Sequence, residues 1–296
     1  MELSQLRMFK TIADLGSIAK AAERLHCVPS NITTRIKNLE EELGEALFIR
    51  KGRGLTLSPA GEIFLGYVNN ILSVCQEAKR AISRDAEPMG TFHLGAIESA
   101  TTSRLPKVLS KYHKRYPKVH IEFSTGTWKE LETAVVKHEL DSAVIAGKSL
   151  HPDIESVQIY QEDIVLIAPA TFDPIDSPND LIGKNIYMWP EGCPYRKALE
   201  NWLIRNQVSA NITSIASYGT IVGCVSSGAG ISLVPRGIYE QLKRNGGIKG
   251  YHFDQLKPIK NYFLWNKNTG FHKTKDAFLA LIQSELQSAL ETEATQ

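Results

Sequence analysis

Residues 17–40 constrain this chain more than any other stretch, because their apolar residues fall into two helical periods separated by only a few residues. Ser17 is predicted to cap the first helix, since a serine side chain accepts hydrogen bonds from the free amides of a first helical turn. The second helix is predicted to begin at about Pro29 or Ser30. Each helix has one apolar face. The inward-facing residues are Ile18, Ala21, Ala22 and Leu25 in the first helix and Ile32, Ile36 and Leu39 in the second. The pattern predicts two packed helices joined by a tight turn.

The outer face of the second helix is polar, and it has no acid before Glu40. Its residues are Ser30, Asn31, Thr33, Thr34, Arg35 and Lys37. Solvated helices usually mix Glu with Lys, whereas hydroxyl, amide and guanidinium groups suit phosphates and base edges in a major groove. The face therefore favours DNA binding, and a plain surface helix is the alternative.

A short basic hairpin is predicted directly after this helix, which should end at Gly44. An apolar strand at residues 47–49 and a returning strand at residues 55–57 flank a tip that is rich in glycine and basic residues. Arg50, Lys51 and Arg53 are its candidates for DNA contact. The net charge of the chain is only +2, so any DNA binding must depend on this local placement of charge.

The segment resembles the amino-terminal part of the LysR-type transcriptional regulators. The shared pattern is a small-residue helix, a recognition helix ending in Leu39-Glu40, an ELG-x-x-LF run and an R-x-x-R/G-x-x-L-T/S-x-A-G wing. The match is close over about residues 1–85, and the remainder is similar to the family's ligand-sensing domain in the order and length of its elements. The family commonly has Ser-Gln-Pro where this chain has Val28, Pro29 and Ser30, so the usual Gln contact does not carry over. The VPSN segment resembles that of the subgroup containing putrescine-utilisation regulators.

The resemblance implies an α/β chain with an N-terminal all-α winged helix-turn-helix and a C-terminal two-lobed effector domain like a periplasmic binding protein. The expected domains are 1–60 for DNA binding, 61–87 for a linker and dimerisation helix, and 88–296 for the effector. Lobe I would span about 91–162 and 267–296, and lobe II about 163–266. The implied partners are double-stranded operator DNA, a small-molecule effector, further copies in a homodimer or homotetramer, and RNA polymerase.

Two further helices are predicted in the N-terminal part. Residues 3–14 place Leu3, Leu6 and Phe9 on one stripe, which would pack behind the helix pair. Residues 59–85 are predicted to form one long helix, and its stripe is too extensive for an 85-residue unit to bury. That stripe consists of Phe64, Val68, Ile71 or Leu72, Cys75, Ala78 and Ile82. We therefore expect a partner helix, and the family resemblance implies antiparallel dimerisation here; packing on the chain's own second domain is the alternative. Residues 86–90, with Pro and Gly, end the helix.

From Gly90 onward, strand and helix patterns alternate with short links, which predicts an α/β fold with a mostly parallel sheet. The expected strands are 91–97, 119–124, 142–146, 164–168, 185–189, 212–216, 231–234 and 261–266. The expected helices are 103–116, 128–138, 194–206, 220–227, 236–243 and 271–290. If the chain crosses twice between two lobes, a cleft forms between them.

Candidate ligand residues lie in loops that lead from strands into helices, because ligands of open α/β sheets bind at the carboxyl ends of strands. They are Glu98, Ser99, Thr101 and Thr102 in one loop, Ser217, Tyr218, Gly219 and Thr220 in a second, and Tyr195 and Arg196 in a third. Hydroxyls and free amides at a helix start would hold a carboxylate. Glu98 would suit a ligand that also carries an amine. The alternatives are that these residues only cap helices and that Arg196 is solvated.

The sequence contains no recognisable catalytic, cofactor or metal constellation. The 228–230 glycines lack the third glycine of a dinucleotide fingerprint, and the eight histidines are scattered. We expect no enzyme activity, no cofactor, no membrane span and a cytoplasmic location, since the first residues lack the apolar run of a signal peptide. A stand-alone solute-binding protein is one alternative. The other is a regulator that senses oxidation through Cys193 and Cys224, although neither has an evident basic activator beyond Arg196.

Overall fold

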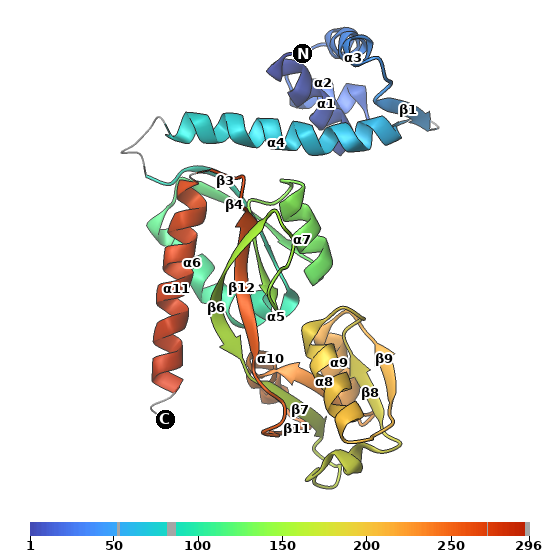
Figure 1. Ribbon diagram of the computed structural model, residues 1–296, viewed down its shortest axis with the longest axis vertical. Coiled ribbons are helices and arrows are strands. Elements are labelled where there is room, and N and C mark those ends of the chain that lie inside the picture. The colour runs from blue at the N-terminus through green and yellow to red at the C-terminus, as the bar shows by residue number, and fades with distance from the viewer. Residues whose placement is uncertain (52–53, 82–86, 271, 294–296) are drawn as a thin grey trace. The chain divides into compact units, whose positions relative to one another are not determined.

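The computed structural model of this protein describes residues 1–51, 54–81, 87–270 and 272–293 (Figure 1). The chain divides into two compact units. The first comprises Met1–Asp85, Lys137–Glu139 and Thr269–His272, and the second comprises Ala86–Val136, Leu140–Asn268 and Lys273–Gln296. Within the described residues, no helix is both long enough and apolar enough to cross a lipid bilayer.

The first unit begins with three helices, α1 (Leu3–Leu15), α2 (Ile18–Arg24) and α3 (Pro29–Leu43). The predicted cap is confirmed, because the Ser17 side chain accepts a hydrogen bond from Lys20 N. The inward residues of α3 are also confirmed. They pack with Leu6, Phe9 and Ile12 of α1 and with Ala21 and Ala22 of α2 in one buried cluster. The apolar periods therefore produced the expected helix pair with a third helix behind it.

The wing is a two-stranded antiparallel hairpin of β1 (Phe48–Lys51) and β2 (Gly54–Leu57). Glu40 connects it to α3, because one carboxylate oxygen accepts from Leu47 N at 2.7 Å and from Phe48 N at 3.2 Å. Gly61 is required by close packing, since a Cβ there would lie 2.1 Å from the carbonyl oxygen of Leu47. The hairpin is thus fixed against both α3 and the helix that follows it.

The long helix α4 (Pro59–Ala81) has two apolar faces rather than one. Val68 is fully buried, and Phe64, Ile71 and Leu72 pack against the cluster of the first unit. These residues contact their own three-helix core, which leaves Phe64, Ile71 and Leu72 half-buried, and the expected partner helix stays a prediction. Of the remaining predicted stripe, Cys75 is half-buried, Ala78 is exposed and Ile82 lies outside the described residues.

A different set of apolar residues on α4 is exposed to solvent. Ile63, Tyr67 and Val74 are 69%, 64% and 50% exposed, respectively. Their spacing of four and seven residues puts them on one face of the helix, away from Val68. This second stripe has no cover among the described residues.

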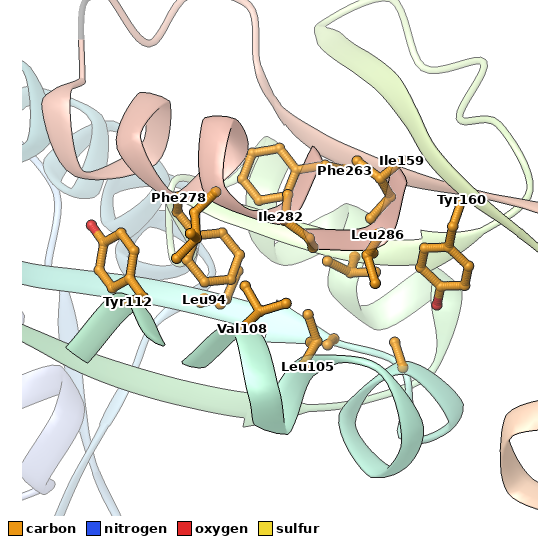
Figure 2. Close-up of a cluster of buried hydrophobic side chains, with 14 of the residues drawn as sticks. Leu94, Leu105, Val108, Tyr112, Ile159, Tyr160, Phe263, Phe278, Ile282 and Leu286 are labelled. Carbon is orange, nitrogen blue, oxygen red and sulfur yellow. The ribbon is translucent and has the colours of Figure 1, made fainter. Parts of the chain in front are cut away.

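In the second unit, the first lobe is built on a five-stranded sheet with the order β4-β3-β5-β12-β6. The strands are β3 (Gly90–Ala96), β4 (Val119–Thr125), β5 (Ser142–Ala146), β6 (Ile154–Glu162) and β12 (Ile259–Asn266). Helices α6 (Leu105–Arg115) and α11 (Lys273–Glu293) pack on one face, where aromatic and aliphatic side chains interlock (Figure 2). Helix α7 (Trp128–Val136) covers the other face.

The second lobe contains two small sheets. In the first, β7 (Ile164–Pro169) lies between β10 (Ser232–Pro235) and β11 (Ile248–Tyr251), with both pairings antiparallel. In the second, β8 (Asn185–Met188) runs parallel to β9 (Asn211–Ser214). The helices of this lobe are α8 (Pro194–Arg205), α9 (Tyr218–Ser226) and α10 (Arg236–Leu242), with short turns η1 (Pro178–Leu181) and η2 (Lys243–Asn245).

The prediction of a mostly parallel sheet is wrong. Only the β3–β4, β3–β5 and β8–β9 pairs of this described unit are parallel, while β12 and β7 each pair antiparallel on both sides. Sequence periodicity missed β6 and β11 altogether. Strand β12 belongs to the first sheet, so the chain has returned to lobe I by residue 259 rather than at 266. Residues 98–103, expected as a loop, form a short helix, α5 (Glu98–Ser103).

Candidate functional site

The outer face of α3 is as polar as predicted. Five of its candidate side chains are exposed, namely Ser30, Asn31, Thr33, Thr34 and Lys37. Thr33 donates to the carbonyl oxygen of Pro29 at 3.0 Å, so its hydroxyl proton is occupied within the helix. Lys37 Nζ lies 3.4 Å from a Glu41 carboxylate oxygen in an exposed ion pair. Such a pair contributes little to stability, so the lysine can leave Glu41 for a phosphate. The face can therefore offer hydroxyl, amide and ammonium groups to a polymer.

Arg35 differs from the other candidates because it already has an acidic partner. Its Nη1 lies 2.7 Å from a Glu2 carboxylate oxygen and 3.2 Å from Ser4 Oγ, and its Nε donates to Asn31 Oδ1 at 3.2 Å. The guanidinium lowers the pKa of Glu2. The residues before and at the start of α1 thus supply an acid to a face that looked free of acid in the sequence of α3 alone.

The wing candidates are described only in part. The Arg50 side chain is exposed on β1, and Lys51 ends that strand. Arg53 lies outside the described residues, as does the Lys51 side chain. Strands β1 and β2 are paired up to Lys51 and Gly54, on either side of the undescribed residues.

A cavity of about 310 Å³ lies between the two lobes of the second unit. Its walls come from residues that follow strand ends, as expected for an α/β cleft. Lobe I contributes Ile97, Glu98, Ser99, Gly126, Thr127, Trp128, Lys129 and Ala146, and lobe II contributes Trp189, Pro190, Glu191, Gly192, Cys193, Pro194, Tyr195 and Tyr218.

Four of the ten predicted ligand residues line this cavity: Glu98, Ser99, Tyr195 and Tyr218. The other six do not line it. Thr101 donates its hydroxyl to the carbonyl oxygen of Ile97, and the Thr102 carbonyl accepts from Gln241 at 2.7 Å. Ser217 caps α9 by accepting from Thr220 N at 3.3 Å, and Gly219 lies within that first turn. For Ser217, the capping alternative describes the structure, whereas the Thr101 hydroxyl bonds to a carbonyl of its own helix.

Arg196 is neither solvated nor directed at a ligand. It is buried, and its Nε donates to Glu200 at 2.6 Å while Nη1 donates to Ser214 Oγ at 2.7 Å and to the Trp189 carbonyl at 3.2 Å. These contacts connect α8 to the ends of β8 and β9. The positive charge is therefore used to hold lobe II together.

Glu98 links the two lobes. Its carboxylate oxygens lie 3.2 and 3.4 Å from the backbone nitrogen of Tyr218, which opens α9. Burial raises the pKa of Glu98, and the Tyr218 amide lowers it in part. The two predicted loops do meet, as expected, but the carboxylate at the α9 start is the protein's own.

Sequence reasoning missed two tryptophans in the cavity. Trp128 opens α7 just after β4, and Trp189 directly follows β8, with its ring centroid 5.4 Å from that of Tyr218. Their positions after strand ends were a usable signal, because the same rule identified Glu98. Sequence alone does not single them out, because most aromatic side chains belong to the hydrophobic core.

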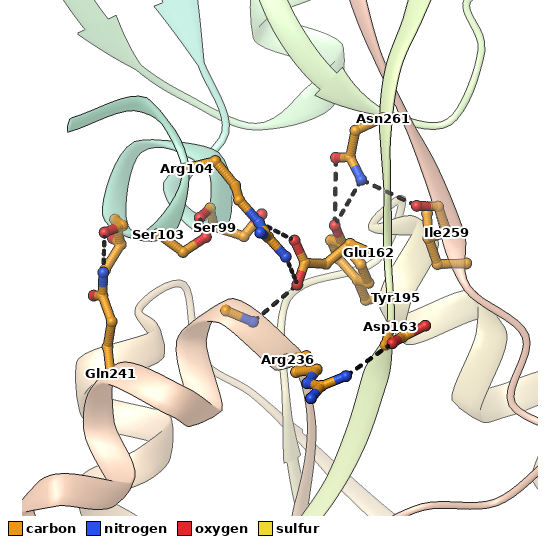
Figure 3. Close-up of polar contacts among 12 residues, drawn as sticks. Ser99, Ser103, Arg104, Glu162, Asp163, Tyr195, Arg236, Gln241, Ile259 and Asn261 are labelled. Carbon is orange, nitrogen blue, oxygen red and sulfur yellow. Dashed lines mark hydrogen bonds and ion pairs between the residues drawn. The ribbon is translucent and has the colours of Figure 1, made fainter. Parts of the chain in front are cut away.

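On another side of α5, polar contacts join the lobes near their crossing, with Gly237 N of lobe II donating to Glu162 and Gln241 donating to the Thr102 carbonyl (Figure 3). The buried Glu162 carboxylate accepts from Arg104 Nε at 2.9 Å and Nη2 at 3.1 Å, and from Gly237 N at 2.8 Å. Gly237 lies so close to α5 that a Cβ there would approach Ser103 to 2.6 Å. Helix α5 is thus connected to lobe II at both of its ends.

The cysteines give no support to thiol sensing. Cys193 lines the cavity, but burial raises the pKa of its thiol, so it stays protonated and is a poor nucleophile. Cys193 and Cys224 are both free in the structure. No group of histidine, cysteine and acidic side chains with metal-binding geometry occurs in the part of the chain that the structure describes.

Comparison with known families covers both units. Residues 3–62 match the family described as bacterial regulatory helix-turn-helix protein, lysR family. Residues 85–287 match the family described as LysR substrate binding domain.

Similar proteins match along nearly the whole chain. The uncharacterised HTH-type transcriptional regulator YusT of Bacillus subtilis is 37% identical over 273 residues, which is 91% of each chain. The HTH-type transcriptional regulator SoxR of an Arthrobacter species is 32% identical over 291 residues, covering 98% of this chain and 99% of SoxR.

Solved structures share the fold at lower identity. Full-length OxyR from Pseudomonas aeruginosa superimposes with a TM-score of 0.79 at 20% identity, covering 97% of this chain and 95% of OxyR. CbnR in complex with its target DNA has a TM-score of 0.68 at 21% identity, covering 97% of this chain and 99% of CbnR.

Proposed function

The chain belongs to the LysR family of transcriptional regulators, and from this premise we propose which of its residues read DNA and which bind the effector. It is a DNA-binding regulator with an effector-binding domain, and it is not an enzyme. The proposed division is residues 1–60 for operator binding, 61–87 for the linker and dimerisation helix, and 88–296 for effector binding.

The proposed operator surface is the outer face of α3 together with the basic wing. Its members are Ser30, Asn31, Thr33, Thr34, Arg35, Lys37, Arg50, Lys51 and Arg53. The exposed hydroxyl, amide and lysine side chains of α3 are the observation that carries this proposal, since short polar groups reach base edges and lysine reaches phosphates. Arg35 would join them by exchanging Glu2 for a phosphate.

The cavity between the lobes is the proposed effector site. Glu98 already joins the lobes through Tyr218 N, so a ligand that engages Glu98 changes the relative stability of open and closed arrangements. A ligand shifts such an equilibrium only by its differential affinity for the two states. The resulting change in subunit arrangement would alter the spacing or bend at which paired DNA modules hold an operator.

The exposed stripe of α4 is the proposed dimer contact. Ile63, Tyr67 and Val74 form an apolar face that a second copy of α4 would bury. We further propose assembly into a homotetramer, action in the cytoplasm and an effect on RNA polymerase at the regulated promoter, because an operator-bound regulator acts there.

A charge reversal tests the operator surface. Lys37→Glu should lower operator affinity by at least tenfold in a fluorescence-anisotropy titration, since it replaces phosphate attraction with repulsion. Lys107→Glu is the matched control, because it makes the same change at an exposed position on α6. Equal affinities for the two variants would remove α3 from the DNA contact.

A further inference from the structure

The cavity is walled mainly by aromatic and aliphatic groups, and its charged groups are mostly acidic. Trp128, Trp189, Tyr195 and Tyr218 contribute rings. Among the described residues that line the cavity, Glu98 and Glu191 are the acids and the exposed Lys129 is the cation. Arg196, the nearby buried cation, donates hydrogen bonds to Glu200, Ser214 and the Trp189 carbonyl, and its Nη2 lies 3.7 Å from the exposed Glu191 carboxylate.

Two of the helix starts that border the cavity, those of α7 and α9, are already occupied by acceptors from the protein. At α7, Thr127 N and Thr127 Oγ1 both donate to Glu130 Oε2 at 2.8 Å, which lowers the pKa of Glu130. At α9, Tyr218 N donates to Glu98. At α8, Pro194 has no amide proton, and Cys193 makes no side-chain cap hydrogen bond. The Thr127 and Tyr218 amides, which would otherwise attract a carboxylate effector, are therefore engaged.

Two polar groups of the cavity lining, Ser99 Oγ and Trp189 Nε1, have no hydrogen-bond partner of good geometry among the described residues. Ser99 is only 3% exposed, it lines the cavity, and its Oγ is unsatisfied, although the Tyr195 hydroxyl lies near it. A buried hydroxyl without a partner costs free energy, which a bound donor or acceptor would recover. Ser99 and Glu98 both line the cavity, so one ligand can reach both.

We propose that the effector is an organic cation, an amine attached to an apolar or aromatic body, whose ammonium group binds Glu98 and Ser99 while its body lies among the cavity tryptophans. An ammonium group donates three hydrogen bonds and accepts none, which matches a carboxylate beside an unsatisfied hydroxyl oxygen. Tryptophan faces attract cations more strongly than other rings do. The expected carboxylate ligand would instead place its charge beside Glu98.

The same arrangement couples binding to the lobes. The ammonium group and Tyr218 N would share the Glu98 carboxylate, whose pKa is raised because the amide compensates its burial incompletely. A cation that neutralises this charge in the cleft stabilises the arrangement in which the lobes meet there. The inference rests on the proposed effector role of the cavity and deepens it.

Two probes of equal length test the sign of the charge. Phenethylamine and 3-phenylpropionate carry opposite charges on the same two-carbon spacer and ring, and 2-phenylethanol is the neutral reference. In isothermal titration with the full chain, phenethylamine should bind at least tenfold more tightly than the other two. Glu98→Gln should weaken phenethylamine ten- to a hundredfold, as expected for the loss of a charge-assisted hydrogen bond of about 1.5–3 kcal/mol. Glutamine can still accept from Tyr218 N, so folding should persist.

Two further variants complete the test. Glu155→Gln, an exposed carboxylate on β6 outside the cavity, should bind phenethylamine as the wild type does. Trp189→Phe removes an indole whose N–H has no partner, and it should weaken phenethylamine severalfold. Tighter binding of 3-phenylpropionate would overturn the cation inference while leaving the effector cavity in place. The cation inference would also be overturned if phenethylamine did not bind, or if Glu98→Gln bound it as tightly as the wild type does. Wild-type operator affinity of Glu98→Gln in the same experiment would show that the DNA-binding function is independent of that outcome.

Discussion

Removing the Arg104 side chain should destabilise the second unit far more than removing Arg236, although both arginines pair with an acid at the same crossing between lobes. The Glu162 side chain is 2% exposed and that of Arg104 is 18% exposed. Arg104→Met leaves Glu162 as a buried charge with only the Gly237 amide beside it. Loss of one partner from a buried pair costs about 3–5 kcal/mol, because the remaining charge has neither water nor a counterion.

Arg236→Met is the matched control. Arg236 Nη1 lies 3.4 Å from Asp163 Oδ2, and the two side chains are 44% and 50% exposed. Water therefore screens their attraction, and it solvates the Asp163 carboxylate when Arg236 is replaced. Exposed pairs of this kind contribute below about 1 kcal/mol. The difference between the two variants should therefore be at least about 2 kcal/mol in the free energy of unfolding.

Urea unfolding followed by tryptophan fluorescence measures this difference cleanly. All four tryptophans, Trp128, Trp189, Trp202 and Trp265, lie in the second unit, so unfolding of the helix-turn-helix does not contribute a tryptophan signal. The double variant Arg104→Met with Glu162→Met should recover part of the loss, since it removes the stranded charge as well. Equal losses for Arg104→Met and Arg236→Met would refute the reasoning that burial makes this pair matter.

Three other perturbations give distinct expected results. Tyr67→Asp combined with Val74→Asp should shift sedimentation toward smaller species while the circular dichroism signal stays helical, because both side chains are exposed; unchanged assembly would exclude this face as the interface. Glu2→Gln should raise operator affinity by up to about fivefold in anisotropy titrations, since it frees Arg35 from an exposed ion pair, and an affinity at or below wild type would show that Arg35 makes no such exchange. Gly61→Ala should destabilise the first unit by about 1–3 kcal/mol in thermal melts followed by circular dichroism, because its Cβ would meet a backbone carbonyl at 2.1 Å, and wild-type stability would mean that the wing can move aside.

The helix-turn-helix could be predicted almost completely because its determinants are local. Ser17 caps the turn that follows it, and Ile32, Ile36 and Leu39 share a face at helical spacing whatever lies beyond them. The wing was equally readable from its glycines and its alternating strands. Long helix α4 was predicted in extent, yet the contact of its buried stripe with the three-helix core was not, because periodicity identifies an apolar face without identifying what covers it.

Sequence by itself determined that this chain carries a helix-turn-helix, a long helix and an α/β domain with ligand-facing loops after its strands. Only the tertiary structure decided what those loops contain. Glu98 accepts a hydrogen bond from the Tyr218 amide, 120 positions away in the chain. Arg196 donates hydrogen bonds to Ser214 and to the Trp189 carbonyl within its own lobe. Hydrogen-bond saturation depends on which groups the fold brings within about 3 Å of each other, and no local pattern encodes that. The charge of the cavity, and hence the class of effector, follows from those distant pairings.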